Sequence, residues 1–111
     1  MPRIRGPKAI MPAADNLFLL NSAFYGSHSR GGKSGELSAD LLVNWDRVYN
    51  RERPLALEIG FNRGLFITNF ARQNPEYSVL GIEIQRRFCW RLANLLVDDP
   101  DAPLNLRVLW A

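Results

Sequence analysis

The chain has 111 residues, of which 47% are hydrophobic, 11% aromatic and 23% charged, and this composition excludes a wholly disordered protein. No apolar run in this sequence approaches the ~20 residues that a membrane-spanning helix needs. The net charge of +3 is unevenly placed, because residues 1–33 contain five Arg or Lys and one Asp, whereas residues 34–111 are close to neutral. A basic arm on a near-neutral body favours contact with a polyanion such as RNA, although a solubilising tail explains the charge equally well.

The single cysteine and the single histidine carry little chemistry. Cys89 has no partner for an internal disulfide, which favours a reducing, cytoplasmic compartment, and its apolar helical surroundings indicate a buried thiol rather than a nucleophile. His28 lies alone in a loop without Cys or carboxylate neighbours at metal-ligand spacing. We therefore expect no metal site.

The first third of the chain predicts an extension followed by one helix. Residues 1–36 are expected to be a basic, largely disordered or irregular extension, because 1–16 hold three prolines and 21–35 hold four glycines and four serines. A helix is predicted over 37–49, with an apolar stripe and with Ser38 as its N-cap. The stripe consists of Leu41, Leu42, Trp45 and Val48.

The remainder alternates between strand and helix patterns. Strands are predicted at 55–59, 77–83 and 105–109, and helices at 64–73 and 84–97. This order is typical of an α/β domain with a parallel sheet, in which right-handed crossovers place the three strands side by side in chain order. We interpret 37–111 as the first half of such a domain, truncated after its third strand. The inward residues of the first helix are expected to be Phe66, Ile67, Phe70 and Ala71. On the second helix, Phe88, Arg91, Leu92 and Leu95 recur at helical spacing.

The stretch "LALEIGFNRG" carries the first chemical signal. A strand leads directly into the carboxylate of Glu58, and a loop bracketed by Gly60 and Gly64 follows, with Asn62 between them. Glycine permits a tight turn and close approach of a ligand to the backbone, and asparagine tolerates positive φ. In open parallel sheets, ligands bind at this carboxyl edge.

The second signal is Glu83 at the end of the next predicted strand, where a carboxylate can accept hydrogen bonds from both hydroxyls of a ribose. Leu65 stands where the dinucleotide fingerprint requires its third glycine, and the acid before the loop would oppose an anionic cofactor. The pattern therefore favours the cationic cofactor S-adenosylmethionine. Structural alternatives remain open: Glu58 as a helix cap, Glu83 as an acid favoured by the next helix dipole, and the glycines as plain turn residues.

The run "LEIGFNRGLFITNFARQNPEYSVLGIEIQ", residues 57–85, resembles the cofactor-binding start of the tRNA (guanine-N7)-methyltransferase family, and "NLRVL" resembles its third strand. The resemblance implies a Rossmann-like class I methyltransferase fold, here incomplete, and S-adenosylmethionine-dependent methylation of guanine N7 in tRNA. It also implies a cofactor site formed by Glu58, Gly60, Asn62, Gly64 and Glu83. The family usually has glycine at the position of Asn62 and often an acid at that of Leu65. Its catalytic residues are expected beyond residue 111, so this chain alone is expected to be inactive.

Contacts with tRNA are expected from cations in the basic arm and the loop, namely Arg3, Arg5, Lys8, Arg30, Lys33 and Arg63. Arg86, Arg87 and Arg91 are interpreted as the outer face of the second helix rather than as an RNA surface. A monomer without membrane contact is favoured. The alternatives are a methyltransferase of the same fold with another substrate and a non-catalytic nucleotide-binding fragment.

Overall fold

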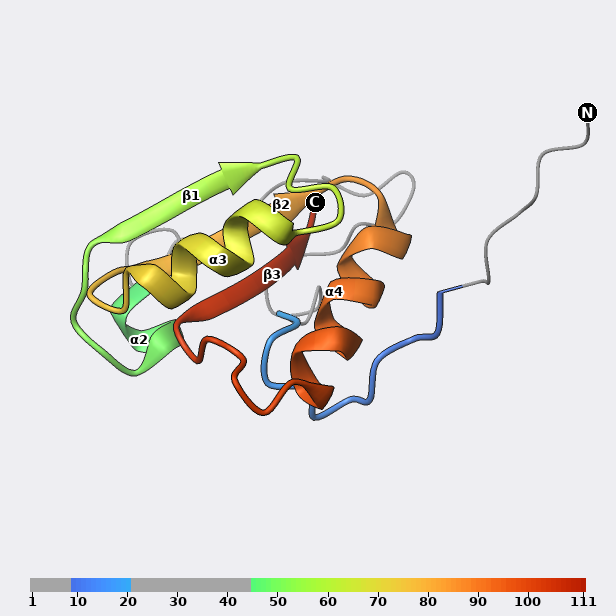
Figure 1. Cartoon of the computed structure of the whole chain (residues 1–111), viewed down its shortest axis with the longest axis horizontal. Helices are drawn as coiled ribbons and strands as arrows, with labels where there is room; N and C mark the ends of the chain where they lie inside the picture. The colour runs from blue at the N-terminus through green and yellow to red at the C-terminus, as the bar shows by residue number, and fades with distance from the viewer. Residues whose placement is uncertain (1–8, 21–44) are drawn as a thin grey trace, which may run out of the picture.

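The structure is a computed structural model that describes residues 9–20 and 45–111 (Figure 1). Its elements in chain order are α2 (Trp45–Tyr49), β1 (Leu55–Ile59), α3 (Leu65–Gln73), β2 (Ser78–Glu83), α4 (Arg86–Asp98) and β3 (Leu106–Trp110). All five elements predicted after residue 50 are present, and no end differs from its prediction by more than two residues. Only the last five residues of the helix predicted over 37–49 are described, and the rest of it, with Ser38, lies outside the described residues.

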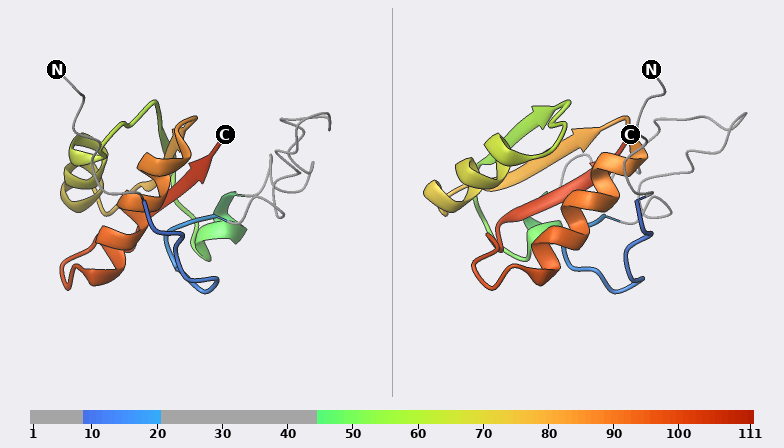
Figure 2. Two further views of the ribbon diagram at one scale, coloured as in Figure 1. Left: turned by 90° about the vertical axis from the view of Figure 1, so that its right-hand side faces the viewer. Right: turned by 45° about the vertical axis from the view of Figure 1, so that its right-hand side comes forward.

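The three strands form one parallel sheet in the order β1-β2-β3, as the crossover rule predicted. Both crossovers place their helices on the same face, so α3 and α4 lie together on one side of the sheet and α2 lies on the other (Figure 1 and Figure 2). The α/β, Rossmann-like prediction is confirmed.

Two apolar clusters hold these layers together. The larger one lies between the sheet and the helices α3 and α4, with Ile67, Cys89 and Val108 no more than 1% exposed. The smaller one lies on the opposite face, where Leu80 and Leu109 are covered by Leu20 and Trp45. The first face therefore contributes most of the buried apolar area that stabilises the fold.

The helix faces differ from the prediction by about one position. Ile67 and Ala71 of α3 are buried, but Phe66 is 69% exposed. The buried stripe of α4 consists of Cys89, Leu92, Ala93 and Leu96, so Arg91 is exposed and Leu95 is 65% exposed. Each helix contacts the sheet along one narrow stripe, and an apolar residue beside that stripe stays in solvent. The inward placement of Phe66 was wrong, and the helical spacing that groups Leu95 with Leu92 does not follow the buried stripe of α4.

The amino-terminal residues that the structure describes are held against the body. Leu19 forms a parallel bridge with Val108 on the outer side of β3, and Phe18 is 4% exposed. The Asn16 side chain accepts hydrogen bonds from the N–H groups of Phe18 and Leu19, and it donates one to the carbonyl of Ala93 in α4. These contacts hold residues 16–19 against β3 and α4, within the extension that composition predicted over residues 1–36.

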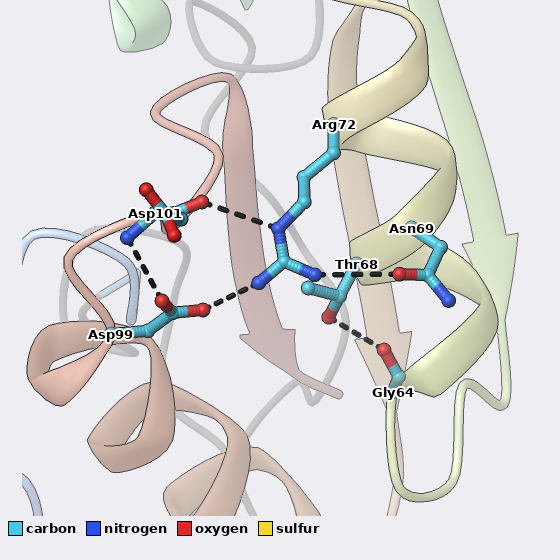
Figure 3. Close-up of polar contacts among 6 residues, drawn as sticks. All are labelled: Gly64, Thr68, Asn69, Arg72, Asp99 and Asp101. Carbon is cyan, nitrogen blue, oxygen red and sulfur yellow. Dashed lines mark hydrogen bonds and ion pairs between the residues drawn. The ribbon is translucent and has the colours of Figure 1, made fainter.

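The amino ends of the strands are fastened by a buried amide. Asn105 is 6% exposed, and its Nδ2 donates to the carbonyls of Ala71, Asn74 and Tyr77 at 2.9–3.1 Å. On the surface nearby, Arg72 pairs with the carboxylate of Asp99 and thereby links α3 to the end of α4 (Figure 3). Both contacts fix the α3 layer over the sheet.

Within the described part of the chain, none of the helices has the length and apolar character that crossing a membrane would require.

Candidate cofactor site

The loop that follows β1 has an alternating backbone conformation. Gly60, Asn62 and Gly64 have φ angles of 78°, 55° and 80°, whereas L-amino acids rarely adopt positive φ. Asparagine is among the residues that tolerate it, which explains how Asn62 occupies the middle position. The turn at residues 60–64 thus brings the chain from the carboxyl end of β1 to the start of α3 within a few residues.

The two glycines serve different purposes. A Cβ atom at Gly64 would lie 2.5 Å from the Cδ2 atom of buried Leu92, so glycine allows α3 to begin close to α4. A Cβ atom at Gly60 would meet no atom within 4 Å, so the space beside this residue is open. Gly60 also donates its N–H to the carbonyl of Ile82 at 2.7 Å, which keeps the open position tied to β2.

Glu58 and Glu83 lie on the same face of the sheet. Glu58 is opposite Gly81 in the strand register, and Glu83 follows Gly81 by two residues, so side-chain alternation directs both acids to the face covered by α3 and α4. Glu58 is half-buried and Glu83 is 4% exposed. The sheet thus presents two carboxylates on one face, at the carboxyl ends of adjacent strands.

The orientation of Glu83 is fixed by the start of α4. One oxygen of its carboxylate accepts a hydrogen bond from the Gln85 N–H at 3.1 Å, and the Cys89 thiol donates to its backbone carbonyl at 3.4 Å. Glu83 therefore accepts a hydrogen bond from the N-cap residue Gln85, and it lies before the first turn of α4, which contains no acidic residue. The remaining carboxylate oxygen is the group that can serve a ligand.

Phe61 is a part of the site that the sequence did not reveal. Its side chain is 5% exposed and packs over Gly81, where an added Cβ atom would lie 2.8 Å from the rings of Phe61 and from Ile67. Gly81 is the strand residue beside Glu58 and two residues before Glu83. An apolar ring therefore covers the sheet between the two acids, and the signal for it was a glycine in the middle of a buried strand.

Phe66 lines two hollows near the start of α3. One, of about 340 Å³, is lined by Phe61, Asn62, Arg63, Gly64, Leu65, Phe66 and Phe88. Glu58 lines a different and smaller one of about 150 Å³ between β1 and α3, together with Phe66 and Phe70. The loop side chains of Asn62, Arg63 and Leu65 are exposed, so they form the outer wall of the first hollow.

Cys89 is a core residue, as its surroundings in the sequence indicated. The side chain is fully buried, and burial, reinforced by the negative charge of Glu83, raises the pKa of the thiol to about 12. A thiol with such a pKa is neutral at physiological pH and does not act as a nucleophile.

The remaining predicted groups are placed as follows. Arg63 is exposed beside the loop, and it stays a predicted RNA contact. Arg3, Arg5, Lys8, Arg30 and Lys33 lie outside the described residues, as does His28. In residues 9–20 and 45–111, there is no cluster of three or more His, Cys, Asp or Glu side chains that could hold a metal ion.

Comparisons with known proteins identify the family. A family described as "Putative methyltransferase" matches residues 52–110, which is just over half of the chain. The chain is 30% identical over 73 residues to a tRNA (guanine-N(7)-)-methyltransferase of Streptococcus sanguinis, and the match covers 65% of this chain and 33% of the relative. A relative of the same name from Pediococcus pentosaceus is 40% identical over 68 residues, covering 60% of this chain and 31% of the relative. The chain thus spans about a third of the length of these relatives, and it belongs to this methyltransferase family.

Proposed function

We propose that this protein serves the S-adenosylmethionine-dependent methylation of guanine N7 in tRNA, in the cytoplasm, with residues 55–85 forming the cofactor-binding part. The observation that carries the proposal is that the carboxylates of Glu58 and Glu83 lie on the same face of the sheet, beside a loop with three positive φ angles. The names of the relatives supply the reaction and the substrate.

The described residues fit this cofactor in three respects. The open space beside Gly60 lets a ligand approach the backbone where any side chain would intrude. Glu58 and Glu83 supply negative charge for a ligand that carries a sulfonium and an ammonium group. Leu65, with its exposed side chain, stands where a dinucleotide site needs glycine, which disfavours a pyrophosphate.

Each residue then has a distinct role. Glu83 would accept hydrogen bonds from the ribose hydroxyls through the carboxylate oxygen that the Gln85 N–H does not occupy. Glu58 would attract the cationic part of the ligand, and Gly60 would contact it through backbone groups. Asn62 and Gly64 hold the loop in its conformation.

The proposed methyl transfer requires no proton transfer at the attacking atom. S-adenosylmethionine supplies a methyl group on a positively charged sulfur. Guanine N7 has an in-plane lone pair and no proton, so the attacking atom needs no general base. The contribution of this chain is to bind and orient the cofactor and, through the buried Phe61 ring, to keep water from the sheet face between the acids. Fixed carboxylates nearby also stabilise positive charge as it moves toward the purine.

Calorimetric titration of the chain with S-adenosylmethionine and, separately, with NAD tests the cofactor class. We expect heat of binding with the first and none with the second. E83Q should weaken binding by about 10-fold or more, because hydrogen bonds to a charged acceptor contribute about 1.5–3 kcal/mol each. E76Q, which removes the same charge at an exposed residue away from the loop, is the matched control.

Absence of heat with S-adenosylmethionine on a folded sample would contradict the proposal. Equal weakening by E83Q and E76Q would show that Glu83 only stabilises the start of α4. A methyltransferase of the same fold with another substrate would give the same cofactor result, and a measurement of tRNA binding separates the two.

A further inference from the structure

Three side chains form a cluster at the amino end of α4. The guanidinium of Arg86 lies 4.5 Å from the centre of the Trp90 ring and 5.6 Å from that of Trp110. The indole N–H of Trp110 donates to the carbonyl of Ile84 at 3.0 Å, which fixes the second ring. We call Arg86, Trp90 and Trp110 the Arg86 cluster.

The Arg86 cluster lies beside the proposed cofactor site. Trp110 is opposite Glu83 in the register of β2 and β3, so the cluster and the acid share the carboxyl edge of the sheet. Ile84, between Glu83 and α4, is 76% exposed. A substrate that reaches the cofactor at this edge would therefore pass close to the cluster.

The charges at this helix start oppose the helix dipole. Arg86 and Arg87 both fall in the first turn of α4, which contains no acidic residue, and the N-cap residue Gln85 makes no side-chain capping bond. Positive charge near a helix N-terminus is unfavourable, and fold stability alone selects Asp or Glu there. The two arginines thus raise the local positive potential at a cost to the helix.

The side chain of Arg86 is held yet accessible. Stacking on two rings restricts the guanidinium, while the residue as a whole remains exposed to solvent. Arg87 stacks in the same manner on Phe88, at 4.9 Å from its ring centre. Preoriented arginines beside aromatic rings are the combination that binds RNA, because the guanidinium pairs with phosphate and the flat groups stack on unpaired bases.

We propose that the Arg86 cluster is a substrate-RNA contact, which binds a phosphate through Arg86 and stacks an unpaired base on its flat groups. The identification of the RNA as tRNA rests on the proposed function, whereas the RNA contact itself rests on the cluster. This assignment differs from the interpretation of Arg86 as merely an outer-face residue.

The test is a titration of a fluorescently labelled tRNA transcript with the chain, at several salt concentrations. Binding is measured as the change in the fluorescence anisotropy of the RNA. We expect R86Q to weaken binding by about 5-fold or more and to lower the slope of log K against log salt by about 0.7–0.9, the value for one lost phosphate contact. R47Q removes the same charge from an exposed residue of α2 on the opposite sheet face, and it should change the affinity by less than 2-fold.

R86K separates charge from stacking. Lysine retains the positive charge but not the planar group, so the salt slope should recover while part of the loss in affinity remains. Quenching of tryptophan fluorescence on addition of RNA should be reduced in W90F, which keeps an aromatic ring in the same position. Equal binding by R86Q and R47Q, or no binding of tRNA by the wild-type chain at low salt, would overturn the inference.

Calorimetry with S-adenosylmethionine keeps the two proposals apart. If wild-type protein binds the cofactor and R86Q binds tRNA as well as R47Q does, the RNA contact is wrong and the proposed function stands. If R86Q selectively loses tRNA affinity in a chain that gives no heat with the cofactor, the contact stands and the proposed function fails.

Discussion

At the residue scale, the loop after β1 uses two glycines at positive φ in different surroundings. Gly60 faces open space, whereas the position of a Cβ atom at Gly64 is already taken by Leu92. A substitution at either position therefore strains the backbone, but only a substitution at Gly64 also creates a steric conflict. This difference can be measured.

Gly60→Ala is expected to lower the free energy of unfolding by about 1 kcal/mol, since alanine pays only the cost of the left-handed conformation. Gly64→Ala should cost about 2 kcal/mol or more, because Leu92 must also move inside the core. Urea denaturation followed by tryptophan fluorescence measures both. Equal losses would mean that the α3–α4 contact at Gly64 is looser than described.

The buried thiol of Cys89 makes the stability of the fold depend on pH. Because the pKa of the thiol is raised from 9.0 to about 12 by burial, the unfolded chain loses this proton before the folded chain does. The stability that the neutral thiol contributes is complete below pH 9 and falls between pH 9 and 12, by up to about 1.4 kcal/mol per pH unit.

Comparison with Cys89→Ala isolates this effect from other groups that titrate at high pH. The advantage of wild-type protein over the variant in urea denaturation is expected to shrink as the pH rises from 9 toward 12, the interval between the two pKa values. A constant difference would contradict a buried thiol.

At the scale of elements, the sequence predicted existence and order well, because strand and helix periodicities and turn residues are local signals. It predicted helix faces less well. Phe66 and Leu95 are apolar and close to the correct stripe, yet each is more than 60% exposed. Which apolar residue lies inward depends on where the helix axis crosses the sheet, and that is decided by tertiary packing.

Asn105 joins the end of α3 and the turn before β2 to the start of β3, and no sequence motif marked it. Replacement by alanine would leave the carbonyls of Ala71, Asn74 and Tyr77 without this donor, so the free energy of unfolding should fall by about 2–3 kcal/mol. Asn69→Ala, on the exposed face of α3, is the matched control and should stay within about 0.5 kcal/mol. Thermal melts of both variants provide the measurement, and a loss of similar size in both would contradict this role.

At the scale of the whole molecule, the described sheet has one uncovered margin. β1 pairs with β2 on one side only, and Leu57 and Ile59 are 52% and 76% exposed on the face opposite to α3 and α4. Continuous apolar strands predicted a sheet covered on both faces, but α2 and residue 20 cover this face only over β2 and β3. An exposed apolar edge strand is a template for association.

Ile59→Lys is expected to reduce concentration-dependent association of the chain, because charge on an edge strand opposes edge-to-edge pairing. Ile10→Lys introduces the same charge at a residue of similar exposure outside the sheet, and it should leave association unchanged. Sedimentation velocity over a range of concentrations gives the comparison. A wild-type chain that remains monomeric at high concentration would contradict the prediction.

The acids and glycines of the proposed cofactor site could be named from the sequence, since parallel strands place such residues at their carboxyl ends. The Phe61 ring over Gly81 could not be predicted, because it depends on a contact between segments that are distant in the sequence. The hydrogen bond that fixes Glu83 could not be predicted either, because it depends on a side-chain rotamer. The Arg86 cluster needed the register of β3 as well, since that register brings Trp110 to the start of α4.

The bridge between Leu19 and Val108 has a consequence for the order of folding. The two bridged residues are far apart in the sequence, so the bridge cannot form before Val108 has been synthesised. Its closure also carries the entropy cost of a long loop. Starting the chain after Leu20 would leave backbone groups of β3 without partners, giving a sheet that is open to solvent along both flanks.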